Sequence, residues 1–117
     1  MDTYIYTLVR RADWAAAEAA GTYTGSADDR RDGFLHFSTA AQLRATAAKH
    51  RGGETDLVIV EAAVAALGET LRFEPPAGGR SGLFPHLYGP LPMAAVTRVL
   101  PLALGADGLH VFPASFD

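Results

Sequence analysis

Apolar residues occur along the chain in short runs whose spacing predicts alternating strands and helices. The aromatic and β-branched run at 4–9 predicts a first strand. An alanine-rich stretch at 13–20 predicts a helix that ends at Gly21, because glycine is favoured just past a helix C-terminus. Residues 25–32 are polar and have no apolar periodicity, which predicts a loop, and the apolar residues of 34–37 predict a short strand.

The second half of the chain predicts one more helix and several strands. Thr39 and Gln42 have the spacing of a capping box, which predicts a helix from Thr39 to about Lys49. The continuous apolar run Leu57–Val60 predicts a strand buried on both faces. The alternation at 71–74 predicts a half-buried strand. Other patterns predict a helical turn at 64–67, a late strand within 93–102 and a last short strand at 110–112.

Two proline- and glycine-rich stretches separate these elements. Residues 84–90 are expected to form a rigid loop, and residues 75–82 a second loop, whose glycine-rich part at 78–82 predicts a mobile hairpin or lid. Helices and strands do not alternate strictly, which favours an α+β fold over a doubly wound sheet. We therefore expect a single domain at 1–117, with two main helices against a small split or mixed β-sheet.

Composition excludes several classes of function. The net charge is −3 and no basic stripe is present, so general nucleic-acid binding is not expected. The chain has no cysteine, which excludes disulfides, thiolate zinc sites and cysteine nucleophiles. We see no leader peptide and no apolar run near the ~20 residues that cross a bilayer. We expect a cytoplasmic protein that is a monomer or weak homodimer.

The first candidate site lies around His36. On a strand, His36 and Ser38 point to one face while Leu35 and Phe37 point to the other. A polar pair next to a helix N-terminus suits a ligand that carries a hydroxyl or phosphate group. The alternative interpretation is structural, with His36 capping a turn and Thr39 or Ser38 capping the following helix.

The second candidate site includes His86 and Tyr88, which the predicted loop at 84–90 would hold at the rim of a pocket. Glu74 ends a predicted strand and can orient a sugar hydroxyl or act as a general base. Arg10 ends the first strand and suits a phosphate or carboxylate. Each of these residues also has a plain structural interpretation: Tyr88 packs at the edge of the core, His86 caps a carbonyl, and Glu74 and Arg10 are solvated charges.

Two other kinds of chemistry are not favoured. The four histidines, at 36, 50, 86 and 110, show no metal-ligand spacing, so no metal site is predicted. Ser38 lacks the flanking glycines of a hydrolase nucleophile elbow.

The motifs taken together resemble a known family. Ile5-Tyr6, Trp14, the segment Asp32–Thr39 and the segment Phe84–Leu91 occur in the order found in the bacterial family called domain of unknown function 952. That family has no established activity. It is in turn similar to the ADP-ribosyltransferase-like superfamily, and His36-Phe37-Ser38 resembles the His-x-Ser element of the RNA 2′-phosphotransferase branch.

This resemblance implies an ADP-ribosyltransferase-like fold whose cleft binds NAD or a similar nucleotide. It places Arg10 against a phosphate and His36, Ser38 and Thr39 against the cofactor. His86, Tyr88 or Glu74 would assist catalysis, although the Arg-Ser-Glu and His-Tyr-Glu triads of the superfamily are absent. Three hypotheses stay open: an enzyme that uses NAD or an ADP-ribosylated ligand, a non-catalytic small-molecule binding module, and a protein-interaction module.

Overall fold

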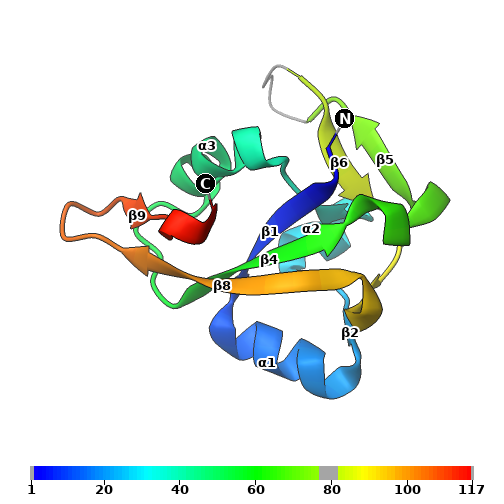
Figure 1. Ribbon diagram of the computed structural model, residues 1–117, viewed down its shortest axis with the longest axis horizontal. Helices are drawn as coiled ribbons and strands as arrows, with labels where there is room; N and C mark the ends of the chain where they lie inside the picture. Colours follow the sequence, from blue (N-terminus) through cyan, green and yellow to red (C-terminus); the bar gives the residue numbers. More distant parts are fainter. Residues whose placement is uncertain (1, 77–81, 117) are drawn as a thin grey trace.

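The computed structural model describes residues 2–76 and 82–116, which form three antiparallel β-sheets and three α-helices (Figure 1). The strands are β1 Tyr4–Arg10, β2 Thr22–Tyr23, β3 Leu35–His36, β4 Leu57–Ala63, β5 Leu71–Glu74, β6 Phe84–Leu87, β7 Leu91–Pro92, β8 Val96–Leu104 and β9 His110–Val111. The α-helices are α1 Arg11–Ala20, α2 Ala27–Asp32 and α3 Ala40–His50. Short 3₁₀ helices occupy Val64–Ala66, Gly68–Thr70, Met93–Ala95 and Ala114–Phe116. The predicted α+β class is confirmed.

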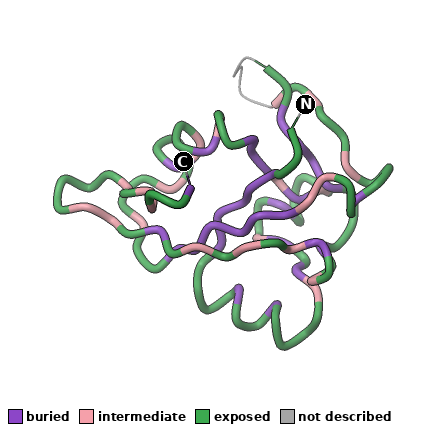
Figure 2. Tube along the Cα trace, viewed as in Figure 1, coloured by how far each residue is buried: buried purple, intermediate pink, exposed green. Residues whose placement is uncertain are grey.

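The central strand of the largest sheet is β4, in the order β1-β4-β8-β9. Six of its seven residues are buried, and the buried trace runs through the middle of the molecule (Figure 2). Val58 and Val60 face one apolar cluster, and Leu57 and Ile59 face the other. Because both faces of β4 are covered, its first four residues, Leu57–Val60, form a continuous apolar run, as predicted.

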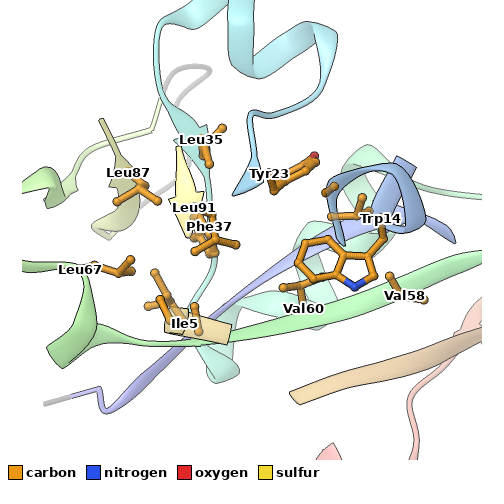
Figure 3. Packing of buried hydrophobic residues seen from close by; sticks show 14 residues of the cluster. Ile5, Trp14, Tyr23, Leu35, Phe37, Val58, Val60, Leu67, Leu87 and Leu91 are labelled. Atoms are coloured by element: carbon orange, nitrogen blue, oxygen red, sulfur yellow. The ribbon is translucent and has the colours of Figure 1, made fainter. Parts of the chain in front are cut away.

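The first apolar cluster packs α1 and the smaller sheets against one face of the central sheet. Trp14 of α1 is 4% exposed and lies beside Val58 and Val60 (Figure 3). Leu35 of β3 and Leu87 of β6 belong to the same cluster. α1 ends where predicted, at Gly21, whose φ of 88° is the left-handed conformation that glycine favours.

The second apolar cluster covers the opposite face of the sheet with α3 and the C-terminal turn. Leu43 and Ala47, four residues apart on α3, are almost completely buried against Leu57 and Ile59. Phe116 closes this cluster with an edge-on contact to Tyr6, at 5.0 Å between ring centroids. As a result, α1 and α3 lie on opposite sides of the sheet (Figure 1).

The small sheet β3-β6-β5 is joined to the edge of the central sheet through Ser38. Tyr6 of β1 donates its N–H to the carbonyl of Ser38 at 2.8 Å and accepts the N–H of Ser38 at 2.7 Å. Phe37 donates to the carbonyl of Pro85 at 3.0 Å, but Pro85 has no N–H to return, so the β3–β6 ladder stays short. This split arrangement fits the predicted split sheet, although every strand pair described is antiparallel.

Three predictions were wrong or incomplete. The predicted loop at 25–32 contains α2, whose N-cap Ser26 forms a capping box with Asp29, so a third helix joins the two expected. The predicted loop at 84–90 begins with β6, which is buried between β3 and β5. The predicted alternation of buried and exposed residues along 71–74 is not observed, since Phe73 in the edge strand β5 is 39% exposed. The predicted lid at 78–82 lies almost wholly outside the described residues.

Among the described residues, no helix has both the length and the apolar character needed to cross a membrane.

Candidate functional site

A cleft of about 870 Å³ lies beside the small sheet. Strand alternation decides which side chains reach it. In β3 and β6, Leu35 and Leu87 face the apolar core, whereas His36 and His86 face the cleft. The rest of the cleft is formed by parts of β1, α2 and α3 and by the segment that follows α3.

His36 is held between two carboxylates. Its Nδ1 lies 2.5 Å from Oδ1 of Asp29 and its Nε2 lies 2.9 Å from Oδ2 of Asp32. A ring that donates from both nitrogens is an imidazolium. The hydrogen bond to Asp29, and then the charges of Asp29 and Asp32, raise the pKa of His36 above its ordinary value despite partial burial. The two carboxylates therefore favour the positively charged form of His36 at the cleft.

Asp29 positions His36 and is itself part of the fold. Its side chain is 8% exposed and accepts the backbone N–H of Ser26 at 2.8 Å and that of His36 at 3.0 Å. Burial alone would raise the pKa of Asp29, but the hydrogen bonds from His36 and Ser26 lower it below its ordinary value. The same carboxylate thus caps α2 and orients the imidazole.

His86 lies next to His36 because β3 and β6 pair these two residues directly. Their ring centroids are 5.8 Å apart, and Phe34 stacks on His86 at 4.1 Å. Nδ1 of His86 lies 2.9 Å from Oε1 of Glu74, and the Tyr88 hydroxyl donates to the same oxygen at 2.6 Å. The hydrogen bond from Tyr88, followed by that from His86, lowers the pKa of Glu74. The four predicted catalytic residues therefore form one connected group.

The predicted cofactor-binding residues are more dispersed. Arg10 lines the cleft and lies 3.5 Å from Glu54. Ser38 also lines the cleft but is 2% exposed, and its hydroxyl lies 2.8 Å from that of Thr46. Thr39 is the N-cap of α3, where its N–H donates to Gln42 at 2.9 Å, and it is not among the residues that line the cleft.

Asp29, Asp32 and Phe34 are site residues that the sequence did not reveal as such. The two aspartates belong to a segment that was predicted to be a loop, so their position next to His36 could not be predicted. The spacing of Ser26 and Asp29 carried a capping signal, and that of Asp32 and His36 is compatible with an ion pair. In the described ranges, no group of three His, Asp or Glu side chains is arranged to hold a metal ion.

Comparisons with known proteins agree with the sequence motifs. Residues 8–99 match the family described as "Protein of unknown function (DUF952)". The crystal structure of protein CC0527 from Caulobacter crescentus is similar, with 43% sequence identity and a TM-score of 0.89 over 97% of this chain and 98% of that one.

The crystal structure of a double mutant of CC0527 has the same TM-score of 0.89 at 42% identity, over 97% of this chain and 98% of that one. The solution NMR structure of CC0527 has a TM-score of 0.80 at 45% identity, over 91% of this chain and 90% of that one. No curated protein matches the chain. The chain therefore belongs to the DUF952 family of proteins of unknown function.

Proposed function

We propose that the cleft binds a small phosphate-bearing ligand of the nucleotide type, such as NAD or ADP-ribose, and that the chain acts on it as an enzyme. The observation that carries the proposal is the pair His36 and His86, which face one cleft from adjacent strands, with ring centroids 5.8 Å apart. Each ring is held by a carboxylate. Imidazoles that are oriented in this way are suited to proton transfer and to stabilising negative charge on a ligand.

The remainder of the cleft supports a nucleotide-sized ligand. Its volume of about 870 Å³ is within the range of small-molecule sites. Phe34 and His86 provide stacked aromatic surface at one wall. Arg10 and Arg51 meet at Glu54, at 3.5 and 3.3 Å, and their guanidinium groups suit phosphate oxygens.

In this proposal every predicted residue except Thr39, which does not line the cleft, has a role. His36 and Arg10 bind anionic groups of the ligand, and Ser38 lies at the ribose. His86 transfers a proton, while Glu74 and Tyr88 hold its ring. The resemblance of His36-Phe37-Ser38 to the His-x-Ser element of ADP-ribosyltransferase-like proteins supports a reaction at the anomeric carbon, where positioning and charge stabilisation supply most of the rate.

A non-catalytic binding module is the second candidate, and one observation favours it. Oε1 of Glu74 already accepts hydrogen bonds from both His86 and Tyr88, so this oxygen holds the two rings in place rather than acting as a base. In that case the cleft would bind the same ligand class and leave it unchanged.

Calorimetric titration with NAD, ADP-ribose and ADP tests the proposal, with His36→Gln and Arg10→Gln as variants. We expect each variant to weaken binding at least about tenfold, the cost of losing a charged contact. Lys49→Gln is the matched control, because Lys49 is exposed and does not line the cleft. Chromatographic assay of NAD for released nicotinamide separates the enzyme from the binding module. The absence of binding at millimolar ligand would refute both.

A further inference from the structure

The carboxylate of Asp32 is bound by two cationic donors inside the cleft. Nε2 of His36 lies 2.9 Å from Oδ2, and Nε of Arg31 donates to Oδ1 at 3.1 Å. Each oxygen of the carboxylate thus has one charged donor, which is also how proteins bind the carboxylate or phosphate group of a ligand. His36, Arg31 and Asp32 all line the cleft.

Asp32 differs from Asp29 in what the fold requires of it. The side chain of Asp29 is 8% exposed and accepts two backbone N–H groups, whereas that of Asp32 is 33% exposed and contacts only side chains in the contacts described. The carboxylate of Asp32 can therefore leave its place without breaking the backbone hydrogen bonds of α2.

The geometry of His36 leaves one nitrogen for a ligand. Nδ1 is occupied by Asp29, which is buried and held by the backbone, so an anion in the cleft can reach His36 only at Nε2. That nitrogen is the one occupied by Asp32. Arg31 would stay near the site if Asp32 left, because Asp28 also holds it, at 3.2 Å.

We infer that Asp32 is an internal ligand, whose carboxylate occupies an anion subsite formed by His36 and Arg31 until a phosphate group of the incoming ligand replaces it. This inference rests on the proposed function and names the subsite in which its ligand's phosphate is bound. A terminal phosphate, such as that of ADP, carries up to two charges and three acceptor oxygens, whereas each phosphate of NAD or ADP-ribose carries one charge, so a terminal phosphate competes best for two donors held by a single carboxylate. Competition by Asp32 lowers the apparent affinity for every anion and disfavours singly charged ones.

Titration with inorganic phosphate and with ADP, followed by calorimetry, tests this inference in the wild type, Asp32→Asn and Asp28→Asn. We expect Asp32→Asn to bind phosphate about tenfold more tightly than the wild type, since the competing charge is removed. Asp28→Asn removes the same charge from the same helix and from the same arginine, but it leaves His36 bonded to Asp32. We therefore expect it to change affinity much less. Adding His36→Gln to Asp32→Asn should abolish the gain.

A second measurement locates the phosphate without relying on affinity. In ¹⁵N spectra of the imidazole, phosphate should shift the Nε2 resonance of His36 in Asp32→Asn and leave that of His110 unchanged, since His110 does not line the cleft. Equal phosphate affinity in Asp32→Asn and Asp28→Asn, or an unshifted Nε2, would overturn the inference. Phosphate binding enhanced by Asp32→Asn, without nucleotide binding in any variant, supports the inference and refutes the nucleotide proposal. Nucleotide binding that Asp32→Asn leaves unchanged refutes the inference and supports the nucleotide proposal.

Discussion

Replacing Asp29 by alanine should weaken the fold and the site together, because one carboxylate serves both. In the variant, the backbone N–H groups of Ser26 and His36 lose their acceptor, at 2.8 and 3.0 Å in the native protein. A hydrogen bond to a charged group contributes about 1.5 kcal/mol at the low end, so the two together contribute about 3 kcal/mol. The hydrogen bond to the imidazole adds little to this loss, because the His36 side chain is 40% exposed and water can replace Asp29 there.

Urea unfolding monitored by tryptophan fluorescence measures this loss. Trp14 is the single tryptophan of the chain and is 4% exposed, so its emission shifts when the core opens. A loss of about 3 kcal/mol should also lower Tm by roughly 10 °C in a domain of this size. Asp28→Ala is the matched control, because Asp28 lies on the same helix, its side chain is 76% exposed and its described contact is one ion pair with Arg31.

An unfolding midpoint for Asp29→Ala equal to that of Asp28→Ala would contradict this prediction. Such a result would mean that water or a shift of α2 satisfies both N–H groups, and that Asp29 is not required to hold His36. Asp29→Asn separates charge from shape: its amide keeps one acceptor oxygen, so its stability should fall between those of the wild type and the alanine variant.

Three other variants test the packing of α2 and the titration of the site. Gly25→Ala should destabilise the protein far more than Gly21→Ala does in urea unfolding, because its Cβ would lie 2.6 Å from the Leu35 side chain, whereas nothing lies within 4 Å at Gly21. His36 has a raised pKa, so its stabilising contribution is complete below about pH 6.5 and is lost as pH rises through the folded value; His36→Gln should remove this slope from unfolding midpoints measured at several pH values. The hydrogen bond to Glu74 raises the pKa of the Tyr88 phenol. In a titration followed by ultraviolet absorbance, Tyr88→Phe should therefore remove a phenol that ionises above the ordinary pKa of tyrosine.

Some of the site was predictable because its signal is local. Alternation along 34–38 correctly placed His36 on the face opposite Leu35 and Phe37, and it required no knowledge of the sheet. The capping signal at Thr39 was equally local and is confirmed by the start of α3. The family motifs were recognisable for the same reason, since each is a short contiguous segment.

Other features depended on partners far away in the chain. Residues 84–87 have proline at position 85, which is unfavourable inside a sheet, yet they form the middle strand because β3 and β5 pair on both sides. α2 has six residues and no apolar stripe, so periodicity could not reveal it. Its stability comes from the Ser26–Asp29 cap and from the contact with His36.

The strong elements β1, α1, α3, β4 and β8, the burial of β4 on both faces and the family of the chain were all predictable from the sequence, because these depend on neighbours within a few residues. Which side chains meet depends instead on the tertiary structure. His36 and His86 are 50 positions apart and become neighbours through antiparallel register, and Asp29 and Asp32 reach His36 because α2 turns back at Gly33, where φ is 87°. The chemistry of the cleft depends on this arrangement of side chains, because the pKa of a group depends on the charges and hydrogen bonds that surround it.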